Sequence, residues 1–357
     1  MLSLFLAAAP VPSNPPVPPV QAAPGLEAVL LDFVPGAVDC GGVNVRTVST
    51  ADPLTIGVML PPGIKLPDLE LSFRLTADGR PLDIGTPKSV PGAGFYLNTR
   101  DLPAAFSLWR FAAGGRERNC TIRFALRHQP IAAAPIEAVY RFAALIHRGE
   151  TGEREAFARI RPTGCVGRGP PAVLLRGFPD YSKLPPVPGA PAYSVVAFDI
   201  DSAGVPVNVG TLTGSGQAQL DEASRDAVIR SRFGEGDARE RCTLPFVQWP
   251  RPPVEAPEDI DLEALRSDGA TCGDVKWAVK PSGDYPIAFQ RRSIEGWAIV
   301  RFDLTAAGQP VRPAVLASAP AAAFGENALA TLYRARAEEQ GTTRTGCVER
   351  VRFRMPN

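Results

Sequence analysis

Three segments of the chain alternate apolar and polar side chains, and each carries the same marker residues. A phenylalanine is followed by a glycine six positions later and by a proline eight positions later. An apolar side chain at every second position is typical of a strand that buries one face, and the glycine suits a tight turn with positive φ. We therefore predict a strand, a hairpin and a second strand in each segment. The markers are Phe73, Gly79 and Pro81; Phe198, Gly204 and Pro206; and Phe302, Gly308 and Pro310.

A helix and a last strand are predicted after each hairpin. In the third segment, Phe324, Ala328 and Leu332 recur at helical spacing and share one face. The corresponding helices are expected at residues 98–111 and 220–233. Each last strand begins at a cysteine and continues with apolar residues on the cysteine's face. The predicted fold class is α+β: three tandem small domains, each an antiparallel sheet with a helix packed on one face.

The six cysteines fall into three pairs with nearly equal separations along the chain. Six cysteines allow 15 pairings, and the repeat selects one of them: Cys40–Cys120, Cys165–Cys242 and Cys272–Cys347. Each bond would close a loop of the chain and stabilise the folded state by on the order of 4 kcal/mol in the chain-entropy model. Such bonds persist in an oxidising compartment. The alternative is six buried free thiols in a cytosolic protein, which would not need matched spacing.

The repeat and the proline-rich stretches divide the chain. We refer to residues 25–129, 150–249 and 258–357 as the first, second and third repeats; residues 250–257 form a proline-rich linker between the last two. Residues 1–24 hold a short apolar run, Leu2–Ala9, and a proline-rich tether. The run resembles the apolar core of a secretory signal, although no basic residue precedes it. No segment is long and apolar enough to be a predicted membrane span.

Composition and motifs give no support for an enzyme. The formal net charge of +1 attracts neither nucleic acid nor an acidic membrane surface, and no cysteines or histidines stand at zinc-ligand spacing. Neither His128 nor His147 lies near a nucleophile motif. Asp199 and Asp201 share the outer face of a predicted strand, where a solvated surface is the better interpretation. We expect no catalytic residue, no metal and no cofactor.

The third repeat resembles the TonB C-terminal domain family. The resemblance rests on Tyr285-Pro286-x-Ala288-x-Gln290-Arg291-Arg292, on Glu295-Gly296 before an alternating strand, on the glycine turn, and on the helix and basic-apolar last strand that follow. The first two repeats keep the strand, turn, helix and strand order but lack both opening motifs. They are similar to diverged copies of the same domain.

The resemblance implies a periplasmic protein that binds an outer-membrane receptor peptide, the TonB box, as an added strand beside the domain's last strand. It also implies a link to TonB-dependent outer-membrane transport. Without a membrane-spanning segment, a binding module is favoured over an energy transducer. The partner-binding residues carried over by position are Tyr285, Pro286, Gln290, Arg291, Val348, Arg350, Arg352 and Arg354.

Two alternatives stay open at this point. Tyr285 and Pro286 could only seal the core of the third repeat, with the arginines forming a solvated face. The whole chain could equally be a structural scaffold of the cell envelope, in which no edge is free for a peptide. Sheet edges could also pair between copies of the chain.

Overall fold

The structure is a computed structural model that describes residues 25–87, 97–146, 150–161, 163–167, 169–267, 269–281, 284–339 and 341–355. The signal-like run Leu2–Ala9, the rest of residues 1–24, and His147 lie outside the described residues. The fold is mixed α+β and consists of several small antiparallel sheets with few helices. The predicted fold class is confirmed at this level.

The third repeat contains a three-stranded antiparallel sheet with a helix against it. The strand order is β15-β14-β17, and α7 contacts both β14 and β15. A separate pair of short strands, β13 and β16, completes the repeat. The bounds are β13 (Trp277–Val279), α6 (Ile287–Arg291), β14 (Gly296–Leu304), β15 (Pro310–Ala319), α7 (Ala322–Leu332), β16 (Arg336–Ala337) and β17 (Arg344–Phe353).

The second repeat has the same order of elements. Its sheet runs β10-β9-β12, α5 packs on it, and β8 pairs with β11. Two further helices, α2 and α3, connect it to the first repeat, and α2 contacts β9, β10 and β12. The bounds are α2 (Ile136–Leu145), α3 (Glu153–Ile160), α4 (Thr163–Val166), β8 (Val173–Leu175), β9 (Ala192–Ile200), β10 (Pro206–Gly214), α5 (Ala218–Arg230), β11 (Arg232–Phe233) and β12 (Arg239–Gln248).

The first repeat adds two strands that the sequence did not predict. Its sheet runs β3-β1-β7-β4-β5, so β1 lies beside the last strand, β7, and β3 lies beyond it. β2 pairs with β6, as β13 pairs with β16. The bounds are β1 (Glu27–Asp39), β2 (Thr47–Ser49), β3 (Ile56–Leu60), β4 (Leu69–Leu75), β5 (Pro81–Leu82), α1 (Asp101–Phe106), β6 (Arg110–Phe111) and β7 (Arg118–Pro130).

Two predicted helices end earlier than expected. The stretch 98–111 contains only α1, and the stretch 220–233 ends its helix at Arg230. In both cases the last residues, including Phe111 and Phe233, form a short strand whose partner lies far back in the chain. The helices expected by correspondence with the third repeat were therefore drawn too long, because tertiary pairing overrides local propensity at these phenylalanines.

The marker glycine makes the same contact in every repeat. Gly79, Gly204 and Gly308 have φ values of 82°, 76° and 76°. A side chain at each would collide with the carbonyl oxygen of Phe111, Phe233 or Ala337. The amide of that same residue donates to the glycine carbonyl at 2.8, 2.9 and 2.8 Å. Glycine is required here because of both the positive φ and the close approach.

The position after each marker phenylalanine also has a fixed partner. Arg74 donates to Asp83 at 2.6 Å, and Asn208 donates to Asp199 at 2.8 Å; Arg312 pairs with Asp303 in the same way. Asp83, Asn208 and Arg312 have φ values of 51°, 53° and 51°. The Asp199 carboxylate therefore belongs to a structural cross-strand pair that recurs in all three repeats.

The predicted disulfide pairing is confirmed. Cys40 bonds Cys120, Cys165 bonds Cys242 and Cys272 bonds Cys347, with Cα–Cα distances of 4.2, 5.0 and 4.9 Å. All six half-cystines are buried. Each bond ties the last strand of a repeat to the segment that precedes its first marker strand, so each repeat has its own covalent closure.

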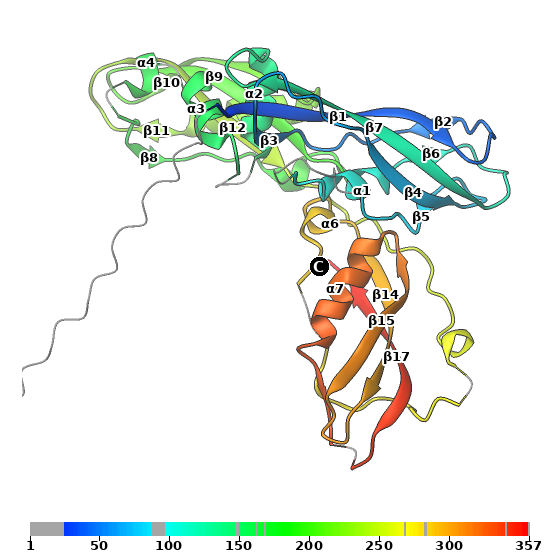
Figure 1. Cartoon of the computed structure of the whole chain (residues 1–357). Helices are drawn as coiled ribbons and strands as arrows, with labels where there is room; N and C mark the ends of the chain where they lie inside the picture. The colour runs from blue at the N-terminus through cyan, green and yellow to red at the C-terminus, as the bar shows by residue number, and fades with distance from the viewer. Residues whose placement is uncertain are drawn as a thin grey trace, which may run out of the picture.

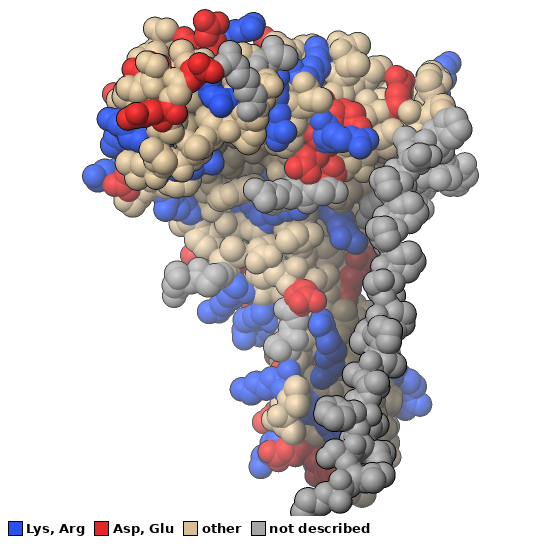
Figure 2. Space-filling model, turned by 90° about the vertical axis from the view of Figure 1, so that its left-hand side faces the viewer, with Lys and Arg blue, Asp and Glu red and all other residues tan. Residues whose placement is uncertain are grey.

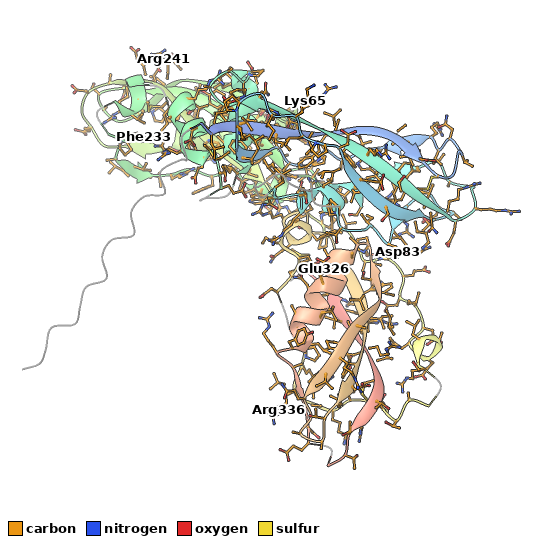
Figure 3. The ribbon with its side chains drawn as sticks, in the orientation of Figure 1. Lys65, Asp83, Phe233, Arg241, Glu326 and Arg336 are labelled. Carbon is orange, nitrogen blue, oxygen red and sulfur yellow. A yellow bond between two sulfur atoms is a disulfide. The ribbon has the colours of Figure 1, made fainter. Side chains whose placement is uncertain are left out.

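The three repeats pack against one another. In Figure 1 the first two form an elongated upper layer, and the third extends below it. One continuous apolar core includes residues of both the first and third repeats. Ile84 pairs with Ala321, the amide of Ala322 donates to the carbonyl of Ile84 at 2.8 Å, and Thr86 donates to Glu326 at 2.8 Å. Figure 3 shows Asp83 and Glu326 at this junction.

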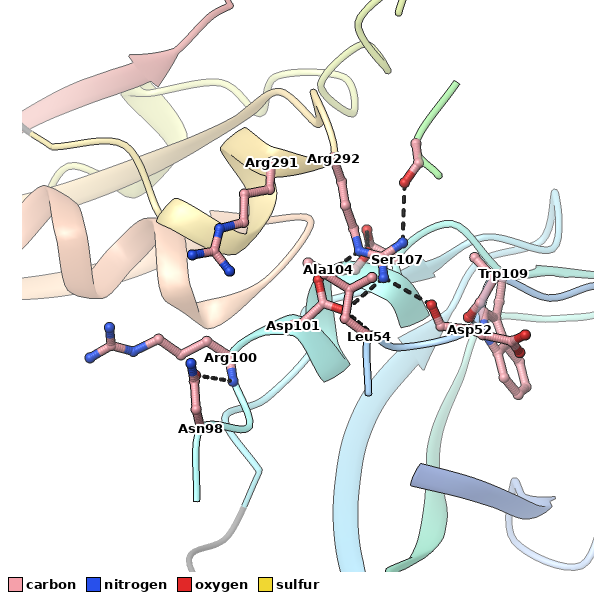
Figure 4. A network of polar contacts seen from close by, with 12 residues as sticks. Asp52, Leu54, Asn98, Arg100, Asp101, Ala104, Ser107, Trp109, Arg291 and Arg292 are labelled. Atoms are coloured by element: carbon pink, nitrogen blue, oxygen red, sulfur yellow. Dashed lines mark hydrogen bonds and ion pairs between the residues drawn. The ribbon is translucent and has the colours of Figure 1, made fainter. Parts of the chain in front are cut away.

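A buried arginine joins all three repeats (Figure 4). The Arg292 side chain is 1% exposed and donates to both carboxylate oxygens of Asp101, at 2.7 and 2.6 Å. It also donates to the carbonyls of Asp52 and Gly189. Asp101 accepts a further bond of 2.6 Å from the amide of Leu54. One guanidinium from the third repeat therefore bonds the first repeat at two places and the second at one.

We expect Arg292→Met to destabilise the chain by about 3–5 kcal/mol, because it leaves a buried carboxylate without its partner. Denaturant unfolding of the full chain measures this loss. Arg127→Gln removes an exposed arginine and is the control for the lost charge, and Asp101→Asn added to Arg292→Met should recover part of the loss. A loss below about 1 kcal/mol would show that the pair is not structural.

Candidate functional site

The β17 edge is the candidate site that the sequence predicted. β17 lies at one side of its sheet and pairs with β14 from Gly296↔Phe353 to Leu304↔Arg344. At its start, Thr345 exchanges two hydrogen bonds with Thr271, at 3.0 and 2.9 Å. Beyond that point, no strand within the described ranges pairs with its outer side.

The first repeat shows what can occupy this side of a last strand. There β1 runs antiparallel to β7, from Val29↔Pro130 to Asp39↔Thr121, with an irregularity between Pro35 and Val38. β7 corresponds to β17 because each is the last strand of its repeat and contains its second cysteine. β1 therefore lies where an added strand would lie on β17.

Two of the predicted edge arginines are engaged within the chain. Arg350 donates to Asp259 at 3.0 Å and also to the carbonyl of Ile260, and Arg352 pairs with the same Asp259. The Arg350 side chain is only 14% exposed. These contacts hold the segment that follows the proline-rich linker. The structure therefore gives both arginines an internal partner.

That segment covers the sheet face opposite α7. Trp297 and Ile299 form a small buried cluster with Ala319, and partly buried Ala256, Leu262, Leu265 and Val348 pack against it. The Trp297 indole donates to the carbonyl of Pro257 at 2.9 Å. The linker itself is paired as well, since Val254 donates to Ser293 at 2.7 Å and accepts from Glu295 at 2.8 Å. The sheet face is thus covered, while beyond Thr345 no strand in the described ranges pairs with the outer side of β17.

Tyr285 contacts the core of the third repeat. Its hydroxyl donates to the carbonyl of Ile294 at 2.7 Å and lies 3.3 Å from the carbonyl of Phe353, at the end of β17. Its ring contacts Phe324 and Phe353 edge-on. Burial, with a smaller contribution from Glu295, raises the pKa of Tyr285, so this hydroxyl remains a donor. Tyr285 thereby fixes the position of the β17 terminus.

The remaining predicted residues lie on or next to α6. Pro286 is buried at the start of that helix, and with Tyr285 it lines a pocket of about 350 Å³ between the first and third repeats. Gln290 is exposed, and Arg291 forms an ion pair of 3.4 Å with Glu150. Arg354 and Arg352 line a separate hollow beside Pro257. Four of the predicted residues therefore lie on or beside α6 and four on or directly after β17, and Tyr285 joins the two groups through its contact with Phe353.

Sequence reasoning assigned no role to Glu349, which lies in the middle of β17. Its carboxylate accepts a 3.2 Å hydrogen bond from the Trp277 indole. Burial raises the pKa of Glu349 despite that bond. The signal was visible as an acidic residue that interrupts the apolar face of the predicted strand. Arg292 was likewise visible only as the second of two adjacent arginines.

Comparison with known proteins adds no family, since no family model and no curated protein matches this chain. None of the helices in the described part of the chain is long and apolar enough to cross a membrane. Among the described residues, no group of three or more histidine, cysteine, aspartate or glutamate side chains could hold a metal ion. Basic and acidic side chains are interspersed on the face shown in Figure 2.

We expect Glu349→Gln to stabilise the chain relative to the wild type increasingly as the pH rises. Burial raises the folded-state pKa of Glu349 above the ordinary glutamate pKa. The neutral carboxyl therefore contributes its full stability only below the ordinary glutamate pKa, and this stability is lost as the pH rises through the folded-state pKa. Glutamine stays neutral and can still accept from Trp277. Urea unfolding at about pH 4 and about pH 7 tests this.

The control for loss of one negative charge is Glu235→Gln, at an exposed glutamate of the second repeat. A stability difference between wild type and Glu349→Gln that does not change with pH would contradict the proposed burial cost.

Proposed function

We propose that this chain is a periplasmic binding protein whose repeats are diverged TonB C-terminal-like domains, and that it takes up an extended peptide at the β17 edge. The observation that carries the proposal is the position of β1 on β7. In the first repeat, β1 lies antiparallel on the outer side of the last strand, β7. In the third repeat, the corresponding side of β17 has no strand partner among the described residues.

Backbone hydrogen bonding supports this mode of binding. An edge strand offers unpaired N–H and C=O groups, and an added strand satisfies them. Each bond contributes about 0.5–1.5 kcal/mol net, so several are needed for useful affinity. The Tyr285 contacts favour binding because they hold the end of β17 in place. A rigid edge loses less conformational entropy when a peptide binds.

The charge of β17 bears on the choice of peptide. Basic side chains outnumber acidic ones in Arg344–Phe353, and Arg354 follows directly. Arg350 and Arg352 share a single carboxylate, Asp259. The edge therefore retains positive charge, which favours a peptide with neutral or acidic side chains. An outer-membrane receptor segment of the TonB-box kind is the proposed partner, and the three disulfides support an oxidising compartment.

A titration of isotope-labelled full chain with peptides from receptor N-termini tests strand addition. We expect backbone amide shifts concentrated in residues 346–354. The residues of β15, at the opposite edge of the same sheet, should change little. The control is the same peptide with proline at alternate positions, because proline removes the backbone N–H that a ladder requires. Equal shifts with both peptides, or shifts confined to another region, would exclude this mode.

A scaffold role is the second candidate, and the packing between the repeats favours it. The third repeat shares a core with the first, and Arg292 contacts both other repeats. A rigid arrangement of the three repeats suits a scaffold that holds partner proteins at a fixed distance. It equally suits a protein that binds a peptide.

Limited proteolysis measures that rigidity. We expect residues 250–257 to resist cleavage in the wild type, because Pro250, Arg251 and Val254 are hydrogen-bonded to other parts of the chain. In Arg292→Met the same segment should be cut faster. Rapid cutting there in the wild type would instead indicate three independently moving domains.

A further inference from the structure

A small pocket with three arginines lies between β3, α2 and α6, away from the β17 edge. Its volume is about 130 Å³, and Arg100, Arg141 and Arg291 are among its lining residues. Arg100 comes from the turn before α1, Arg141 from α2 and Arg291 from the end of α6. The first and third repeats and the connecting helix each contribute one guanidinium.

The carboxylates nearby do not balance these charges. Asp101 lines the pocket, but both its oxygens accept from the buried Arg292. Glu150 pairs with Arg291. Neither Arg100 nor Arg141 has an acidic partner among the residues that the structure describes.

The side-chain geometry brings positive charge to one side. In Figure 4 the Arg100 and Arg291 side chains extend toward the same side, away from the Arg292–Asp101 pair. The Nε of Arg291 is buried and has no hydrogen-bond partner in the described structure. Like charges near a partly apolar wall repel more strongly than in water. An anion in the pocket would remove that repulsion and supply the missing acceptors.

The other lining residues indicate the size and kind of anion. Leu54, Leu145 and Ile287 form apolar walls, and Thr55 and Asn98 add polar groups. The pocket has room for several water molecules. This volume suits a small molecule, and it is too small for a folded partner. Arginine recognises carboxylate and phosphate oxygens with two parallel hydrogen bonds.

We propose that this pocket binds a small organic anion, a carboxylate or a phosphate monoester, through Arg100, Arg141 and Arg291. Its apolar part lies against Leu145 and Ile287. The site is independent of the peptide edge proposed above, because it shares no residue with β17. A ligand here contacts two repeats and the helix between them, so its binding stabilises their arrangement.

Calorimetric titration of the full chain tests the proposal, with benzoate, phenyl phosphate and neutral benzamide as probes at constant ionic strength. We expect saturable binding of at least one anion and none of benzamide. Arg141→Gln and Arg100→Gln should each weaken binding by about tenfold or more, because each removes a charge-assisted hydrogen bond. Arg141→Lys keeps the charge but loses the planar guanidinium that donates two parallel hydrogen bonds, so it should weaken binding less than Arg141→Gln does.

Arg127→Gln, at an exposed arginine of β7, is the matched control and should bind as the wild type does. Circular dichroism of each variant checks that it is folded. Preference for benzoate identifies a carboxylate ligand, and preference for phenyl phosphate identifies a phosphate. The proposal is overturned if neither anion saturates, if benzamide binds equally well, or if Arg127→Gln loses as much affinity as Arg141→Gln.

Discussion

The arrangement of the repeats depends on the buried pair between Arg292 and Asp101. Two charged groups without water are stable only when every donor and acceptor is used, and here the guanidinium contacts Asp101, Asp52 and Gly189 together. Separating the third repeat from the others would break all four of these hydrogen bonds of Arg292. This constraint places α6 beside α1 and brings Arg100 and Arg291 to the wall of one pocket.

The repeats share one plan but differ at the outer side of the last strand. In the first repeat β1 fills that side, and in the third the corresponding segment turns across the sheet face instead. Asp259 directs this path by pairing with Arg350 and Arg352. A strand-addition site would expose Arg350 and Arg352, but here both arginines help to hold this segment over the sheet face opposite α7. The edge backbone, more than its arginines, is the feature that a peptide would recognise.

Local patterns predicted much of each repeat. The alternating strands and the three disulfides were readable because a strand's period and a copied cysteine spacing are properties of the chain alone. Phe111 and Phe233 were misassigned to helices because their strand partners, β2 and β8, lie far back in the chain. Tyr285 was predicted as a partner-binding residue, and only the structure shows that its hydroxyl bonds the end of β17.

The sequence by itself determined the repeated unit, its glycine turn and its sulfur cross-links, since each follows from spacing and backbone chemistry within one repeat. Only the tertiary structure decided which charges are buried and which segment lies beside each last strand. Those outcomes depend on contacts between residues such as Asp101 and Arg292, which lie 191 positions apart. No periodicity along the chain encodes a pairing between residues so far apart. The pairing arises from the way in which the folded repeats pack against one another.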